Sequence, residues 1–82
     1  MNMKIANTNH ILEIKMVHYC NIVNGIKDFE VRRNKDYKVG DTIKFKMVSG
    51  MELQGLWNIK YLHGNGYGMK KNFVILGIER IV

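Results

Sequence analysis

Apolar residues change their spacing near residue 16, which predicts a strand followed by a helix. In residues 9–15, Leu12 and Ile14 share one face of a strand. From residue 16 onward, apolar residues recur three, four and seven positions apart, the spacing of one helical face. The residues on that face are Met16, Tyr19, Cys20 and Val23. Asn24-Gly25 then predicts the end of the helix, because glycine readily adopts the left-handed conformation of a C-terminal cap.

Alternation resumes at residues 28–34, DFEVRRN, and predicts a strand with one apolar and one charged face. Phe29 and Val31 share the apolar face, and Glu30 and Arg32 share the charged face. Lys27 stands at the junction between helix and strand, where alternation does not determine its direction. Taken alone, the charged face is either an ordinary solvent-exposed strand face or the lining of a binding cleft.

Three more strands complete the predicted sheet: residues 42–48 and 51–62, in which inward positions alternate, and the closing segment 73–82. Gly40-Asp41 and Ser49-Gly50 mark turns, and Gly55 predicts a bulge or sharp bend. The side chains expected to point inward are Ile43, Phe45, Met47, Leu53, Trp57, Ile59 and Tyr61. Five strands and one short helix predict a small, mostly antiparallel β-barrel.

The composition is that of one small folded domain over residues 1–82, with residues 1–8 as a flexible or short extension. Hydrophobic residues make up 46% of the 82 residues, which is enough for a folded core. No apolar run approaches the roughly 18 residues of a membrane span, and the N-terminal residues lack a signal-peptide pattern. The single cysteine cannot form an internal disulfide. We therefore expect a cytoplasmic protein.

The sequence shows no pattern typical of a metal site, a cofactor site or a catalytic nucleophile. His10, His18 and His63 show no metal-ligand spacing, and the single serine, Ser49, lies in a turn. The residues around Cys20 predict a buried, inert thiol, since His18 two positions away lies on a different helical face. We expect neither a metal nor a cofactor.

The formal net charge of +6 favours polyanionic partners. The glycine-rich residues 63–68 precede a strand rather than a helix and lack a G-K-[ST] ending, so they are not predicted to bind nucleotide phosphates. A flexible loop is expected there, and a lid over a cleft is the alternative, because Lys70 and Lys71 follow directly. Tyr67 in this loop is a candidate for base stacking.

Three segments resemble the ASCH domain, a branch of the PUA-like barrel superfamily. The pattern Gly25-x-Lys27-x-x-Glu30-x-Arg32 looks like its signature, and DYKVGDTIKF is similar to its V-G-D turn and next strand. The closing segment YLHGNGYGMKKNFVILGIE resembles that of short ASCH-like proteins from phages and bacteria. The resemblance covers about residues 9–80, nearly the whole chain.

The resemblance implies a mostly β fold, with five to six strands, one or two short helices, and a cleft between barrel and helix that is thought to bind RNA. Lys27, Glu30 and Arg32 would line this cleft, and Gly25 would allow the turn into it. The supporting residues would be Arg33, Tyr67, Lys70 and Lys71.

Two other functions remain open. Some ASCH relatives are amidohydrolases that deacylate N4-acylated cytidine with a Lys, a Thr and a Glu. Lys27 matches the first of these residues, but Glu30 stands where the Thr would be, and this favours a non-catalytic RNA or nucleoside-binding module. A phage or bacterial protein-interaction module is the third possibility. The oligomeric state is not predicted.

Overall fold

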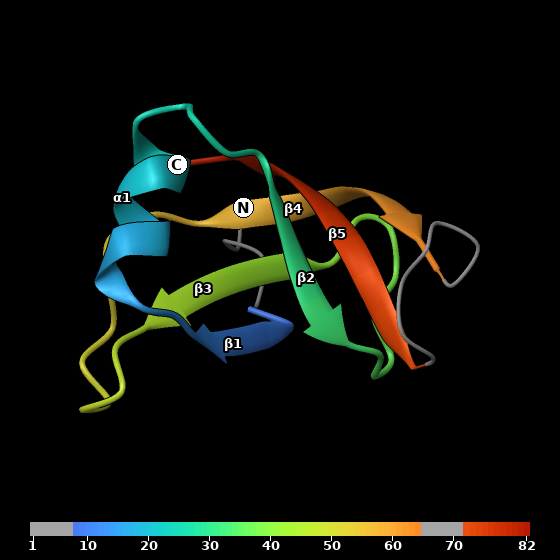
Figure 1. The fold of residues 1–82 in the computed structure, drawn as a ribbon, viewed down its shortest axis with the longest axis horizontal. Coiled ribbons are helices and arrows are strands. Elements are labelled where there is room, and N and C mark those ends of the chain that lie inside the picture. Colours follow the sequence, from blue (N-terminus) through green and yellow to red (C-terminus); the bar gives the residue numbers. More distant parts are fainter. Residues whose placement is uncertain (1–7, 65–71) are drawn as a thin grey trace, which may run out of the picture.

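Five strands and one helix follow the predicted order in the computed structural model, which describes residues 8–64 and 72–82 (Figure 1). The elements are β1 His10–Glu13, α1 Met16–Val23, β2 Phe29–Arg33, β3 Thr42–Lys46, β4 Trp57–His63 and β5 Phe73–Arg80. The predicted extension, except for residue 8, lies outside the described residues.

The strands form one curved sheet in the order β1-β3-β4-β5-β2. All neighbouring pairs are antiparallel except β1 and β3, which are parallel. The sheet curls into a half-barrel, with its edge strands β1 and β2 on either side of the opening (Figure 1). The prediction of a small, mostly β, barrel-like fold with a short helix is confirmed.

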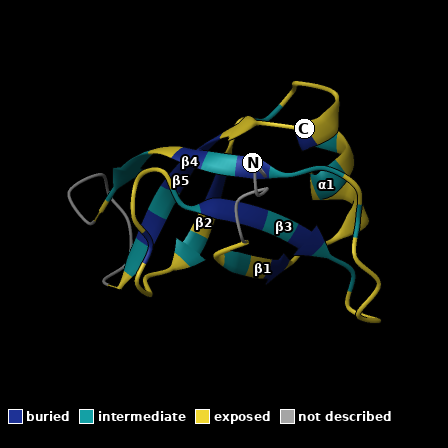
Figure 2. Ribbon diagram, turned by 180° about the vertical axis from the view of Figure 1, so that it is seen from behind, coloured by how far each residue is buried: buried dark blue, intermediate teal, exposed yellow. Residues whose placement is uncertain are grey.

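The concave side of the sheet holds the core, as the alternation predicts. Ile43, Phe45, Trp57 and Ile59 are buried, and the Phe45 and Trp57 rings meet edge to face with centroids 5.2 Å apart. Figure 2 shows this burial along β3 and the neighbouring part of β4. Removing such side chains from water contributes about 1.5–3 kcal/mol each. The complete core comprises Leu12, Ile14, Ile22, Tyr37, Ile43, Phe45, Trp57, Ile59, Val74, Leu76 and Ile78.

A register shift in β4 makes the prediction for Tyr61 wrong. Ile59 pairs with Ile78, but the next paired residue is Tyr61, opposite Gly77, so Lys60 is an extra residue. Beyond this shift Leu62 packs against the core, and Tyr61 lies half-buried on the other face. A Cβ atom on Gly77 would overlap the Tyr61 ring, so glycine leaves the space that this ring occupies.

The predicted strand over residues 51–62 begins six residues late, at Trp57. Before it, a single bridge joins Lys46 to Glu52, and Leu53 packs against the core. Gly55 lies in a sharp bend with φ +103°, and a Cβ atom there would stand 2.6 Å from the Trp57 ring. The bend therefore requires glycine and confirms the second alternative for this residue. Met47, expected to point inward, is half-buried just after β3 ends.

Helix α1 has the predicted bounds but packs through a different face. Ile22 is buried and Tyr19 half-buried, whereas Cys20 is exposed, so the prediction of a buried thiol is wrong. Six of the eight residues are apolar, and such a helix offers more than one apolar face. The Tyr19 hydroxyl donates to the Gln54 carbonyl at 2.7 Å and holds α1 against the segment before β4. No described helix has the length and apolarity needed to cross a membrane.

Strand β1 is fastened to the turn before β3 by side-chain hydrogen bonds. His10 Nε2 lies 2.8 Å from Asp41 Oδ2, and Asn9 Oδ1 accepts from the Thr42 backbone N–H at 2.8 Å. The hydrogen bond with His10 lowers the pKa of Asp41 below its usual value. This carboxylate therefore adds stability above its ordinary pKa, and the contribution is lost as pH falls through the lower folded value.

Candidate functional site

Strand β2 turns its charged face inward and its apolar face outward. Glu30 pairs with Leu76 and Arg32 with Val74, both of which point into the core. Glu30 is only 5% exposed, whereas Phe29 and Val31 are 38% and 46% exposed. An ordinary solvent-exposed strand face is thereby excluded for Glu30. The reversal is possible because β2 is an edge strand, whose inner face looks across the opening of the half-barrel.

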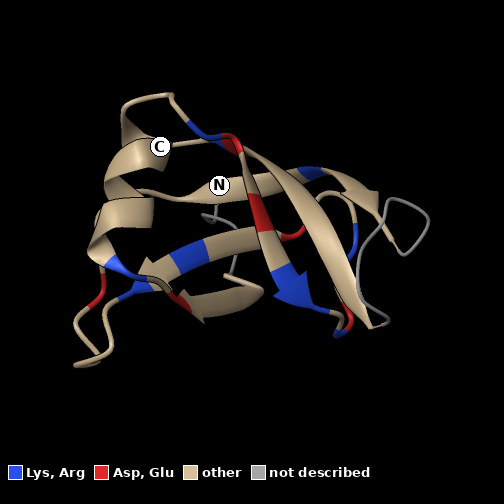
Figure 3. Cartoon of the chain, viewed as in Figure 1, with Lys and Arg blue, Asp and Glu red and all other residues tan. Residues whose placement is uncertain are grey.

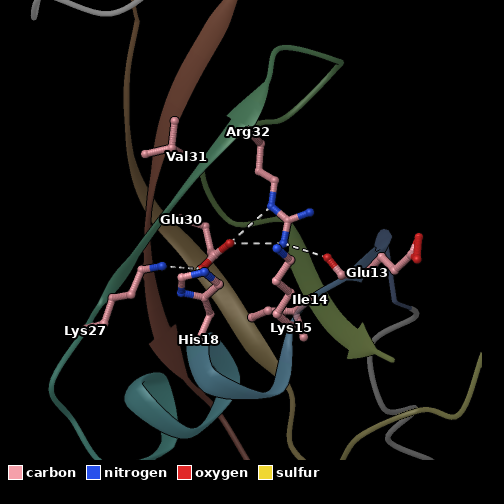
Figure 4. Close-up of a pocket in the computed structure, with 8 residues that line it drawn as sticks. All are labelled: Glu13, Ile14, Lys15, His18, Lys27, Glu30, Val31 and Arg32. Atoms are coloured by element: carbon pink, nitrogen blue, oxygen red, sulfur yellow. Dashed lines mark hydrogen bonds and ion pairs between the residues drawn. The ribbon is translucent and has the colours of Figure 1, made fainter. Parts of the chain in front are cut away.

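Two cations hold the buried Glu30 carboxylate (Figure 4). Lys27 Nζ donates to Oε2 at 2.9 Å, and Arg32 donates to Oε1 through Nε at 3.2 Å and Nη2 at 3.0 Å. Arg32 Nη2 also donates to the Glu13 backbone carbonyl at 3.0 Å. This last bond spans the opening between β2 and β1, where the backbone ladder does not close.

The three residues line a hollow of about 360 Å³, which we name the Glu30 cleft. Its lining comes from the end of β1 and the two residues after it, the first turn of α1, and the strand β2 with the segment before it. The lining residues are Glu13, Ile14, Lys15, His18, Lys27, Glu30, Val31 and Arg32. Figure 4 shows the Lys27, Glu30, Arg32 and His18 side chains gathered in it. The barrel and the helix thus both contribute to its walls.

Two of the other residues singled out from the sequence, Gly25 and Arg33, do not line the Glu30 cleft. Gly25 is exposed with φ +76°, so it makes the turn that leads the chain from α1 toward Lys27. Arg33 points to the opposite face of β2, with its guanidinium 5.2 Å from the centre of the Phe73 ring. Tyr67, Lys70 and Lys71 lie outside the described residues.

Sequence reasoning missed Glu13, Lys15 and His18 as lining residues. His18 is one of only two polar residues in α1, and its position in the first turn is a weak signal. Glu13 and Lys15 join the cleft only because the parallel pairing of β1 with β3 brings the end of β1 opposite β2. No local pattern carries that information.

The Glu30 cleft offers several free donors, and little acceptor capacity remains on Glu30 itself. A carboxylate has about four lone-pair sites, and the contacts above use three of those of Glu30. Lys27 retains two donors, and the Nη1 group of Arg32 has no partner among the described residues. Such a group of donors suits phosphate or base carbonyl oxygens.

Among the described residues, the lining carries neither a hydroxyl nor a thiol that could serve as a nucleophile. Within residues 8–64 and 72–82, no three His, Cys, Asp or Glu side chains are grouped so that they could hold a metal ion. The described part of the cleft therefore offers binding groups more clearly than catalytic ones.

One protein-family model matches residues 9–78, and it is described as a domain of unknown function (DUF3850). The match covers the Glu30 cleft and every described strand except the last two residues of β5. A comparison with curated proteins found no match.

Proposed function

Because the chain belongs to the DUF3850 family, a domain of unknown function, we propose a function from its site: the protein is an RNA-binding module. The observation that carries this proposal is the buried Glu30 carboxylate, held by Lys27 and Arg32 inside an open hollow. The Glu30 cleft would receive one nucleotide of a single-stranded segment.

The cost of burying charge supports a binding role. An ion pair removed from water is often no more stabilising than well-packed apolar residues of the same size. The Lys27–Glu30–Arg32 group does, however, hold two cationic side chains in fixed directions at the wall of a hollow. Preorganised donors of this kind raise affinity, because less side-chain freedom is lost when a ligand binds.

The chemistry of the lining favours RNA over a simple anion. Free N–H groups of Lys27 and Arg32 can donate to base or phosphate oxygens, and the remaining acceptor site of Glu30 can take a base amino group. Sequence-specific proteins read unpaired RNA bases in this way. The net charge of +6 would attract the phosphate backbone from a distance.

The resemblance to ASCH and PUA-like domains supports the same function. Lys27, Glu30 and Arg32 are the residues of the signature-like pattern, and they are also the residues that meet in the cleft. Membership of that superfamily and a cytoplasmic location stay predictions.

The proposal is tested with a fluorescein-labelled pool of random 12-nucleotide RNA, whose anisotropy is followed across a salt series. Lys15→Gln and His18→Ala change lining residues that are exposed and outside the Glu30 ion pairs. Each should weaken binding about three- to tenfold, and a lost phosphate contact should reduce the salt slope by about 0.7. Lys60→Gln, at an exposed site on β4 away from the cleft, is the control.

Thermal unfolding of each variant shows whether it remains folded. An RNA pool that fails to bind at low salt would reject the function. If the lining variants and the control weaken RNA binding equally, the Glu30 cleft is not the RNA-binding site.

The contact between Lys27 and Glu30 keeps deacylation of N4-acylated cytidine as a second candidate, since the amidohydrolases that this chain resembles use a Lys and a Glu together with a Thr. No Thr lines the described cleft, however, and Lys27 Nζ donates to Glu30 instead of standing free as a nucleophile. Incubation with N4-acetylcytidine followed by chromatography decides the matter. Cytidine formation that Lys27→Met abolishes would support this enzyme, and no product at high protein concentration would reject it.

A further inference from the structure

A second hollow adjoins the Glu30 cleft and shares Glu13 and Arg32 with it. It has a volume of about 340 Å³, and we name it the Lys46 hollow. Its lining residues are Ile11, Leu12, Glu13, Arg32, Arg33, Lys35, Tyr37 and Lys46. The Arg32 side chain and the Glu13 carbonyl form the ridge between the two spaces. A ligand longer than one nucleoside could therefore pass from one into the other.

The two spaces differ in charge. The Glu30 cleft carries three Lys or Arg side chains and two Glu side chains, so its formal charge nearly cancels, with His18 neutral. Among the described residues, the Lys46 hollow is lined by the cationic Arg32, Lys35 and Lys46 against the single Glu13, while the Arg33 side chain at its edge turns to the opposite face of β2. Figure 3 shows basic positions on β3 and at the end of β2, the elements that bound the Lys46 hollow. The second space is thus the one suited to an anion.

The cations of the Lys46 hollow are available to a ligand. Lys35 and Lys46 form no ion pair or hydrogen bond through their side chains with any described residue. Arg33 packs on the Phe73 ring and meets no described carboxylate. Lys27, by contrast, already holds Glu30. Lys46 lies in register with Glu13 and Glu52 but forms an ion pair with neither, so its ammonium group, like that of Lys35, can contact phosphate.

Tyr37 adds a neutral donor at the base of the Lys46 hollow. Its ring is buried against His10, with centroids 4.6 Å apart, and its hydroxyl has no hydrogen-bond partner among the described residues. No buried polar side-chain atom of the described chain is left unsatisfied, so this oxygen reaches the surface. Burial raises the pKa of Tyr37, although Arg32 partly opposes the rise, so the hydroxyl stays protonated at neutral pH.

We propose that the Lys46 hollow binds the phosphate that adjoins a nucleotide seated in the Glu30 cleft. The ligand class is then a phosphorylated nucleotide or an RNA strand, and a free nucleoside would fill only half of the site. This inference rests on the proposed RNA-binding function and specifies which part of the ligand each space takes. Lys35 and Lys46 contact phosphate, whereas Glu30 and Lys27 face the base or the sugar.

The test is an amide NMR titration of the isotope-labelled protein with each of the four nucleosides and with their 3′- and 5′-monophosphates. Monophosphates of one polarity should bind about tenfold more tightly than the nucleosides and shift amides around both spaces. Nucleosides should shift only those around the Glu30 cleft. In the Lys35→Gln/Lys46→Gln variant the advantage should fall to about twofold, with nucleoside affinity unchanged. The matched single change Lys60→Gln should preserve the tighter binding of monophosphates over nucleosides.

The random RNA pool separates the two proposals. A protein that binds the pool, but binds nucleosides and monophosphates equally or neither detectably, would overturn the phosphate site and leave RNA binding standing. A loss of the monophosphate advantage in Lys60→Gln as well would also overturn it. A protein that binds neither the pool nor any monophosphate would overturn both.

Discussion

Glu30 owes its buried position to its neighbours on both sides in the sequence. Lys27, three residues earlier, reaches one carboxylate oxygen, and Arg32, two residues later, reaches the other. A carboxylate in an apolar surrounding is costly unless it is paired and hydrogen-bonded. Glu30 can therefore be buried because both of its cationic partners lie within three residues of it in the sequence. Removing either cation leaves the carboxylate under-paired.

This dependence predicts unequal roles for two adjacent arginines on β2. Arg32→Ala leaves Glu30 with Lys27 alone and should lower the free energy of unfolding by about 2–4 kcal/mol. Arg33→Ala removes an exposed side chain on the opposite face that contacts Phe73, and should cost less than about 1 kcal/mol. Urea unfolding measures both.

A further Glu30→Ala change tests the cause. In the Arg32→Ala background it should recover part of the lost stability, because it removes the under-paired carboxylate. Equal costs for Arg32→Ala and Arg33→Ala would contradict the interpretation of Glu30 as a buried charge that depends on Arg32.

At the scale of the elements, the packing of β4 on β5 requires a glycine at position 77, which has no side chain. The extra residue Lys60 shifts the register, so that Tyr61 lies opposite Gly77 and its ring covers the space where a Cβ atom would stand. Val74, Leu76 and Ile78 then point to the core from β5, and Gly77 lies between β4 and β2 on the outer face. The outer face of β5 thus depends on glycine for a steric reason.

Gly77→Ala is expected to destabilise the fold by about 1–3 kcal/mol, because the added methyl group overlaps the Tyr61 ring. Gly64→Ala is the matched control, since its Cβ atom would meet nothing within 4 Å. Neither glycine has a positive φ, so the difference reports steric overlap and not backbone strain. Thermal unfolding measures whether Gly77→Ala is less stable than Gly64→Ala.

The double variant Gly77→Ala/Tyr61→Ser should be less destabilised than the sum of its single changes, because the overlap is then absent. Additive effects would show that Tyr61 is not the obstacle.

At the scale of the whole molecule, basic charge is widespread, but only part of it surrounds the two hollows. The net charge of +6 alone would bind any polyanion. The curled sheet brings β1 and β2 from its two edges to the same opening, and the Glu30 cleft and the Lys46 hollow both lie there. Position in the fold should therefore matter more for RNA affinity than the total charge.

A charge comparison measures this. Lys60→Glu changes the charge by two units, from +6 to +4, yet should weaken binding of the random RNA pool by no more than about twofold. Lys46→Gln changes it by one unit and should weaken binding about three- to tenfold. Anisotropy at a single moderate salt concentration suffices. An affinity that follows net charge, with Lys60→Glu the weaker binder, would contradict a localised site.

The sequence by itself determined the order of the elements and the central part of the core. Alternation is a local property, so it placed Ile43, Phe45, Trp57 and Ile59 inward, and the helix stop at Asn24-Gly25 follows from the conformational freedom of glycine. It also placed Glu30 and Arg32 on one face of one strand. The grouping of charges at the centre of the candidate site therefore follows from local pattern alone.

Only the tertiary structure decided which faces are inside. Alternation divides β2 into two faces but does not say that the charged one turns inward, because this depends on an edge position and on Leu76 and Val74 of β5. The face of α1 that packs, the register shift at Lys60 and the contribution of Glu13 likewise depend on partners distant in sequence. Local patterns determine which faces of a strand or helix could be buried, and pairing with residues distant in sequence determines which of these faces is buried.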